Sequence, residues 1–380
     1  MDPVTDIAPF QIAVPDAVLD DLRHRLTNTR WPEAECVDDW SQGIPLGYTR
    51  ALADYWANGY DWRAREAALN RFDQYVTEID GLDIHFIHQR SPHPDALPLV
   101  ITHGWPGSIA EFQKVIGPLT DPTAHGGRAE DAFHVVCPSL PGYGFSGKPA
   151  ATGWGVERTA RAWDDLMVRL GYTRYGAQGG DWGAAVTTQI GRNVGHCIAI
   201  HTNMPMGRPA AGTTEFTAEE QNALAALKRY QDVDSGYAKQ QSTRPQTIGY
   251  GLVDSPVGQL AWIVEKFWSW TDHDGDVESA LSRDEMLDDV MIYWATATGA
   301  SSARLYWESF RVFGGGQKKV ELPTGVASFP KEILRAPRSW CETGYNITHW
   351  TTMPRGGHFA AFEQPELFVD DVRAFFATVR

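Results

Sequence analysis

Gly176-Ala177-Gln178-Gly179-Gly180-Asp181-Trp182-Gly183 is the stretch that decides the fold. An apolar run enters this glycine-rich turn, and the helix-like segment 184–190 leaves it. Glycines on both sides of Asp181 permit a strained turn that lifts one side chain above a helix N-terminus, where the helix dipole favours an anion. The pattern is that of the strand-to-helix turn written G-x-S-x-G, with aspartate at the place of the nucleophilic serine.

The exchange of serine for Asp181 limits the chemistry. A serine oxygen that attacked a saturated carbon would leave an ether, whereas a carboxylate leaves an alkyl ester that water can cleave in a second step. The turn therefore predicts attack on a carbon that is not a carbonyl, as in epoxides and alkyl halides. An aspartate that only caps the helix at a glycine-rich turn is the common alternative, so the prediction depends on partners elsewhere in the chain.

Composition excludes several classes of protein. The 380 residues include 33 Lys and Arg against 48 Asp and Glu, a formal charge of -15, which argues against nucleic-acid and anionic-membrane partners. The first six residues show no signal peptide, and no apolar run approaches a membrane span of about 20 residues. The four scattered cysteines lack metal-ligand spacing and suit a reducing cytoplasm. We therefore expect a cytoplasmic enzyme without a metal, and the 15 tryptophans suggest an aromatic pocket.

Three kinds of segment follow one another along the chain. Residues 1–75 are helical in pattern and predict an N-terminal extension, with helices near 15–26, 48–58 and 62–70. Residues 76–205 and 313–380 alternate strands with amphipathic helices, which predicts an α/β core around a mostly parallel sheet. Residues 206–312 interrupt that alternation with aromatic-rich helical stretches and predict an inserted lid. This arrangement around a nucleophile turn is typical of the α/β-hydrolase fold.

A catalytic triad of this fold runs nucleophile, acid, histidine along the chain. His358 follows a strand and precedes the last helix, and Gly356-Gly357 leave room for a loop that aims its ring. It is the expected base for the water that cleaves the ester. Glu332, after the penultimate strand, is the expected orienting acid, with Glu342 and Glu363 as the other possibilities.

Two further groups complete the expected chemistry. The backbone N–H groups of Trp105, in His103-Gly104-Trp105-Pro106, and of Trp182 are the expected oxyanion hole. Opening of an epoxide also needs an acid for the leaving oxygen, and a phenol stays protonated at neutral pH. Four of the lid tyrosines are candidates for this role: Tyr237, Tyr250, Tyr293 and Tyr306.

Taken together in order, these motifs resemble the epoxide hydrolases with an extended N-terminal region, such as the microsomal and juvenile-hormone types. The segments that carry this resemblance extend over nearly the whole chain. They are residues 14–16 to 29–32, 103–108, 141–146, 179–183, 242–245, 254–258, 265–267, 323–325 and 355–363. The resemblance implies Asp181 as nucleophile, His358 as base and Glu332 as its acid. It also picks out Tyr237 and Tyr306 as the two phenols. The missing hydrophobic N-terminal anchor favours a soluble enzyme of bacterial type.

Other interpretations stay open at this point. A haloalkane dehalogenase shares the aspartate nucleophile, often with a tryptophan after it as Trp182 is here, but the N-terminal extension argues against it. A catalytically silent α/β-hydrolase used as a small-molecule receptor is a third possibility, and a serine esterase is disfavoured. We expect a cofactor-free reaction on a bulky or aryl epoxide, in detoxification or natural-product biosynthesis. A homodimer is left open.

Overall fold

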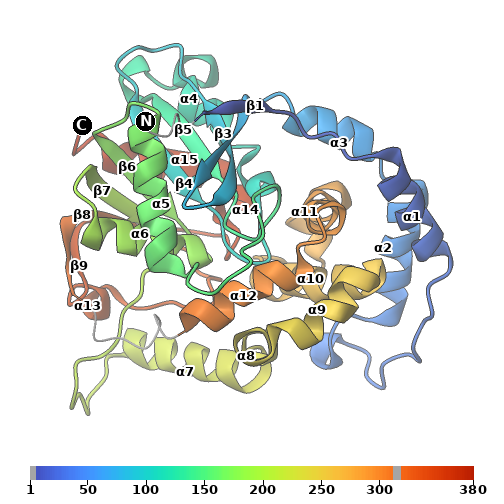
Figure 1. Ribbon diagram of the computed structural model, residues 1–380. Helices are drawn as coiled ribbons and strands as arrows, with labels where there is room; N and C mark the ends of the chain where they lie inside the picture. The colour runs from blue at the N-terminus through green and yellow to red at the C-terminus, as the bar shows by residue number, and fades with distance from the viewer. Residues whose placement is uncertain (1–5, 311–317) are drawn as a thin grey trace.

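A nine-stranded sheet forms the centre of the computed structural model, which describes residues 6–310 and 318–380 (Figure 1). The strand order is β1-β2-β3-β5-β4-β6-β7-β8-β9. The sheet is parallel from β5 to β9, whereas β1, β2, β3 and β5 pair antiparallel in that order. The strands are β1 (Ala8–Phe10), β2 (Gln74–Ile79), β3 (Leu82–Gln89), β4 (Leu97–Thr102), β5 (Phe133–Pro138), β6 (Tyr175–Gly179), β7 (Cys197–Thr202), β8 (Val320–Ser328) and β9 (Tyr345–Thr352).

The position of β4 decides where a site can form. β5 lies on one side of β4 and β6 on the other, so the chain changes direction across the sheet at this strand. Ligands of open α/β sheets bind beyond the carboxyl ends of the strands at such a switch point. Because Thr102 at the end of β4 pairs with Gly179 at the end of β6, the segments that follow both strands emerge side by side.

Helices cover both faces of the sheet (Figure 1). On one face lie α5 (Val156–Arg169) and α6 (Asp181–Asn193), and on the other lie α4 (Ile116–Thr120) and α15 (Pro365–Phe376). Two glycines let α15 approach closely, since a Cβ on Gly176 would lie 2.3 Å from the ring of Phe376 and one on Gly325 would lie 2.5 Å from that of Phe375. The short helices α13 (Arg338–Cys341) and α14 (Ala360–Glu363) complete the core.

The N-terminal extension contains the expected helices α1 (Asp16–Thr27), α2 (Leu46–Asn58) and α3 (Trp62–Leu69). It differs from the sequence expectation in one respect, because it also supplies strand β1 to the central sheet. A strand of three residues is too short to show an alternating pattern, so the sequence could not reveal it. Its pairing covers the edge that β2 would otherwise expose.

The described part of the segment expected to be a lid, residues 206–310, is mainly helical from Ala218 onward. Its helices are α7 (Ala218–Val233), α8 (Gly236–Thr243), α9 (Pro245–Asp254), α10 (Pro256–Trp270), α11 (Arg283–Ala295) and α12 (Gly299–Ser309). Pro245 and Pro256 each stand in the first turn of a helix, where proline is tolerated. The expected boundary at residues 312 and 313 lies outside the described residues.

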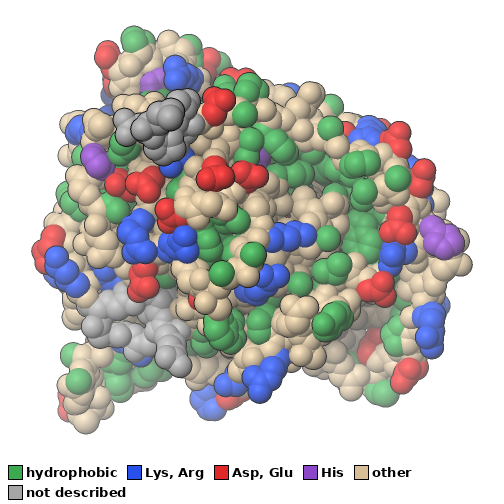
Figure 2. All heavy atoms as spheres, in the orientation of Figure 1, with side chains coloured by type: hydrophobic (Ala, Val, Ile, Leu, Met, Phe, Trp, Pro, Cys, Tyr) green, Lys and Arg blue, Asp and Glu red, His purple; other side chains and the backbone are tan. Residues whose placement is uncertain are grey.

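Charged side chains of both signs are interspersed over the face in Figure 2. Within residues 6–310 and 318–380, no helix is long and apolar enough to cross a membrane.

Candidate active site

Asp181 occupies a strained turn between β6 and α6. Its φ of 49° lies in the left-handed region, which a non-glycine residue rarely adopts. The neighbouring glycines are required by close approaches: a Cβ on Gly183 would lie 1.9 Å from the backbone oxygen of Thr102, and one on Gly179 would lie 2.2 Å from that of Gly183. The turn that the sequence predicts therefore forms, with the Asp181 carboxylate raised above the start of a helix.

The loop after β4 brings a backbone donor to this carboxylate. The N–H of Trp105 donates to Asp181 Oδ1 at 2.8 Å, and a Cβ on Gly104 would lie 2.3 Å from the same oxygen. The expected donor Trp105 thus stands where an oxyanion hole needs it. The Trp182 side chain is buried and its ring meets that of Tyr306 edge to face at 4.8 Å, while its N–H as second donor stays a prediction.

His358 lies between two carboxyl groups. Its Nδ1 hydrogen-bonds Glu332 Oε1 at 2.6 Å, and its Nε2 is 3.4 Å from Asp181 Oδ2. Burial by itself lowers the pKa of His358, but Glu332 and Asp181 together raise it well above its usual value. The imidazole is therefore protonated at neutral pH. The structure brings the three expected triad residues together in the expected order of contacts.

Glu342 and Glu363, the other candidates for the acid that orients His358, have different partners. Glu342 is exposed and accepts from Arg338 Nε at 2.7 Å. Glu363 accepts the backbone N–H groups of Asp272, Gly357 and Phe359 at 2.7 to 3.1 Å, and so fastens the loop that carries the histidine. Burial raises the pKa of Glu363 to about 7. Neither residue takes the place of Glu332.

The lid places two of its tyrosines against Trp105, the residue whose N–H contacts Asp181. The rings of Tyr237 and Tyr306 contact that of Trp105 at 4.8 and 5.9 Å, and they lie 5.8 Å from each other. Burial raises the pKa of both phenols well above the usual value, and the charge of Asp181 adds to the shift. Both therefore keep their protons at neutral pH.

The other two candidate tyrosines, Tyr293 and Tyr250, have different surroundings. Tyr293 donates its hydroxyl to the backbone oxygen of Gly107 at 2.9 Å, which is a structural contact, and Tyr250 is 70% exposed. Among the described residues, the Tyr306 hydroxyl is buried and its O–H has no acceptor. A buried, unpartnered donor is costly unless a ligand satisfies it.

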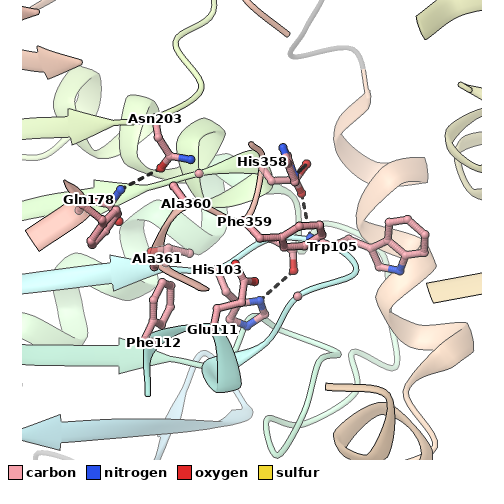
Figure 3. A pocket seen from close by; sticks show the side chains of 16 residues that line it. His103, Trp105, Glu111, Phe112, Gln178, Asn203, His358, Phe359, Ala360 and Ala361 are labelled. Carbon is pink, nitrogen blue, oxygen red and sulfur yellow. Dashed lines mark hydrogen bonds and ion pairs between the residues drawn. The ribbon is translucent and has the colours of Figure 1, made fainter. Parts of the chain in front are cut away.

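A small cavity of about 20 Å³ adjoins Asp181 and His358, which is room for about one water molecule. Figure 3 shows Glu111, His103 and His358 around this space. Glu111 was not expected from the sequence. A Cβ on Gly107 would lie 1.5 Å from Glu111 Oε1, and burial raises the pKa of this carboxyl to about 8. Its spacing from Ser108 matches a helix cap, and that commonplace pattern gave no sign of a cavity residue.

The described residues hold no group of three or more His, Cys, Asp or Glu side chains that could bind a metal. What the site contains is a carboxylate held by a backbone N–H, a paired histidine and two protonated phenols. Such a set can perform nucleophilic attack on carbon, general-acid donation and general-base activation of water.

Comparisons with known proteins agree with this chemistry. A family model described as "Epoxide hydrolase N terminus" matches residues 7–112, and one described as "alpha/beta hydrolase fold" matches residues 98–253. The chain is 56% identical over 378 residues to a Stigmatella aurantiaca protein described as a candidate epoxide hydrolase, covering 98% of this chain and 86% of that protein. It is 38% identical over 405 residues to epoxide hydrolase 1 of Oryctolagus cuniculus, covering 98% and 89%.

Solved structures give the same result. The epoxide hydrolase of Aspergillus niger superposes with a TM-score of 0.89 at 34% identity, covering 99% of this chain and 97% of that one. The juvenile hormone epoxide hydrolase of Bombyx mori superposes with a TM-score of 0.90 at 31% identity, covering 99% and 95%.

Proposed function

The chain belongs to the epoxide hydrolases of the α/β-hydrolase fold, and on that premise we propose that Asp181, His358, Glu332, Tyr237 and Tyr306 carry out its reaction. The enzyme converts an epoxide and water to a vicinal diol. It is a hydrolase that acts on an ether bond. The roles of the individual residues follow from the geometry of the site.

The first step forms a covalent ester. A carboxylate oxygen of Asp181 attacks an epoxide carbon, and the bond between that carbon and the ring oxygen breaks. Tyr237 and Tyr306 donate hydrogen bonds to the ring oxygen, which leaves as an alkoxide and takes a proton from a phenol. Trp105 N holds Asp181 Oδ1, which leaves Oδ2 as the nucleophilic atom.

The second step hydrolyses the ester. Alkylation removes the negative charge of Asp181, so the pKa of His358 falls and its neutral form becomes available as a base. His358 takes a proton from water, which attacks the ester carbonyl of Asp181. The oxyanion that forms is stabilised by the Trp105 N–H, and by that of Trp182 if it is the second donor. Collapse of this intermediate releases the diol and restores the carboxylate.

One observation carries the assignment. The buried hydroxyl of Tyr306, which has no acceptor among the described residues, and the hydroxyl of Tyr237 belong to neighbouring rings that both pack against Trp105, whose N–H donates to Asp181. A dehalogenase stabilises a halide with indole N–H groups and has no need of two phenols. A receptor has no need of the His358–Glu332 pair at 2.6 Å. Both alternatives are therefore disfavoured.

Trapping of the ester tests the assignment. In His358→Gln, alkylation should proceed and hydrolysis should stop, so intact mass should rise by the mass of one substrate molecule. Peptide mapping should place the adduct on Asp181. Asp181→Ala, the matched control, should form neither adduct nor diol. An adduct on another residue, or none at saturating epoxide, would remove Asp181 as nucleophile.

We further propose a bulky or aryl epoxide as substrate. The aromatic rings of Trp105, Tyr237, Tyr306 and Trp270 pack against one another at centroid distances of 4.8 to 6.3 Å, and Trp105 contacts Asp181 through its N–H. Such a cluster of rings suits stacking against an aryl group. A panel of aryl and small alkyl epoxides, with matched bromoalkanes, should give diol without halide and a higher kcat/KM for the aryl members. Halide release in place of diol would contradict both choices.

The four cysteines are free, which is consistent with the proposal of a cytoplasmic location. A homodimer stays a prediction.

A further inference from the structure

Tyr230 lies outside the machinery described above but contacts it directly. It belongs to α7, and its hydroxyl oxygen is 2.9 Å from that of Tyr237, a distance at which either phenol can be the donor. Tyr237 is 5% exposed, whereas Tyr230 is only half-buried. Tyr230 therefore stands between the epoxide-facing phenol and the outside of the lid.

Substrate binding would settle the direction of this hydrogen bond. A phenol has one proton to donate and two lone pairs with which to accept. Once Tyr237 donates its proton to the epoxide oxygen, only its lone pairs remain for Tyr230, which must then be the donor. In such a chain each hydrogen bond polarises the next one, so donation from Tyr230 strengthens the hydrogen bond from Tyr237 to the epoxide oxygen.

The two epoxide-facing phenols are unequal in this respect. Among the described residues, the Tyr306 hydroxyl has no phenol as a hydrogen-bond partner. Tyr237 has Tyr230 as a partner and also lies beneath a cation, since Lys266 Nζ is 4.8 Å from the centroid of its ring. Lys266 and the Tyr237 ring therefore form a cation–π contact, which helps to hold the ring in place.

The cation is held firmly in place. Lys266 is 5% exposed and forms an ion pair with Asp234 at 2.8 Å. Asp234 also accepts from the indole Nε1 of Trp270 at 2.6 Å, and the Trp270 ring lies 5.1 Å from that of Tyr237. Asp234 is the residue that directly follows α7, so the same part of the lid positions Tyr230 and the anchor of the cation.

We propose that Tyr230 acts through Tyr237 as the proton supply for epoxide opening. When Asp181 attacks, the carbon–oxygen bond breaks and its electron pair stays on the alkoxide oxygen. Tyr237 passes its proton to that alkoxide, Tyr230 passes its own proton to the Tyr237 oxygen, and water outside the lid reprotonates Tyr230. His358 releases a proton to solvent when alkylation lowers its pKa and regains one from the hydrolytic water, so the cycle is balanced. The inference rests on the proposed function and assigns the general acid to one of its two phenols.

Single-turnover kinetics test the inference. Tyr230→Phe keeps the ring and removes the hydroxyl, and it should slow formation of the ester about three- to tenfold, as expected for one lost hydrogen bond. Hydrolysis of the ester should keep its wild-type rate, because Tyr230 has no part in it. Tyr250→Phe, on the exposed face of the lid, is the matched control and should change neither step.

A double-mutant cycle distinguishes proton transfer from Tyr230 through Tyr237 from a general effect of Tyr230 on packing of the lid. In a Tyr237→Phe background, Tyr230→Phe should have no further effect on ester formation, whereas in a Tyr306→Phe background it should keep its full effect. A wild-type rate of ester formation in Tyr230→Phe would overturn the inference, and so would equal effects in both backgrounds. If ester still forms on Asp181 in these cases, only the inference fails; if no ester forms in His358→Gln, the proposed function itself fails.

Discussion

His358 has to change its protonation state between the two steps, and its neighbours provide for that change. In the resting enzyme two carboxyl groups face its ring, at Nδ1 and at Nε2. Alkylation neutralises Asp181 alone, so Glu332 continues to orient the ring while the raised pKa of the imidazole falls. The base becomes available only after the ester exists.

Glu332→Gln tests this coupling. The amide keeps the shape of the side chain but removes its charge, so the variant should still alkylate while hydrolysis slows on the order of 10² to 10⁴-fold, as for orienting acids of other triads. Rapid quench should show the ester as the dominant enzyme form in the steady state. Glu342→Gln, the matched control, should leave turnover unchanged, and a wild-type rate of hydrolysis in Glu332→Gln would contradict the role.

Glu111 gives a prediction about stability and pH. Its folded-state pKa is raised to about 8, so between its usual value near 4.5 and about 8 the folded state holds a proton that the unfolded state has lost. Stability contributed at this position therefore falls as pH rises through that window. Glu111→Gln cannot ionise, so its free energy of unfolding should rise relative to that of the wild type between pH 5 and pH 8.5. The expected relative increase is roughly 1–3 kcal/mol, a figure that is reduced because the carboxyl adjoins the cavity. Urea unfolding at both pH values measures it, and a constant difference would contradict the burial of this carboxyl.

Single residues were predictable where a short motif defines their chemistry. The glycine-flanked Asp181 and the histidine before the last helix could be found from the sequence because chain order and local spacing determine their roles. The choice of Tyr237 and Tyr306 among four lid tyrosines needed a family resemblance, since it depends on which helix faces turn toward the core. Glu111 and Tyr230 were missed because only long-range packing brings them to the site.

At the scale of elements, one buried cluster joins the N-terminal extension to the lid. Asp288 of α11 is fully buried and accepts from Arg65 Nε at 2.8 Å and from the Tyr60 hydroxyl at 2.9 Å. Tyr55 of α2 contacts the same helix through Asp284 at 2.8 Å. These contacts fix the helix that also supplies Tyr293 to the loop after β4.

Asp288→Ala should therefore destabilise the protein strongly. It leaves Arg65 and Tyr60 without their acceptor, and loss of one partner of a buried ion pair costs about 3–5 kcal/mol, reduced here to about 2–4 because Arg65 is partly exposed. Denaturant unfolding measures the change. Asp20→Ala removes an exposed pair with Arg23 and should cost less than about 1 kcal/mol. Equal effects in the two variants would contradict the cluster as an anchor.

The three helices of the N-terminal extension match the sequence expectation to within about two residues, because their periodicity is local. Strand β8, from Val320 to Ser328, has no such clear pattern. Pro323 and Gly325 lie inside it and weaken the strand pattern, and the pairing with β9 shifts register around them. Such irregularities depend on the neighbouring strand and cannot be read from one segment.

At the scale of the whole molecule, all three parts of the chain contribute to the site. The core supplies Asp181, His358 and Glu332, the lid supplies the phenols, and the extension braces the lid and closes the sheet edge. A chain that begins at residue 74 should therefore fail to fold cooperatively, since it exposes the edge of β2 and uncovers the buried face of α11. Circular dichroism and thermal unfolding of that chain are the measurement, and a single sharp transition with wild-type diol formation would contradict the role of the extension.

The covalent intermediate is the central claim, and a single turnover of the wild-type enzyme in H₂¹⁸O tests it most directly. With enzyme in excess over epoxide, the oxygen added to the first diol should come from Asp181 and carry no label, while the peptide containing Asp181 should gain one ¹⁸O. A labelled diol in the first turnover, with an unlabelled Asp181 peptide, would show direct attack by water and contradict the mechanism.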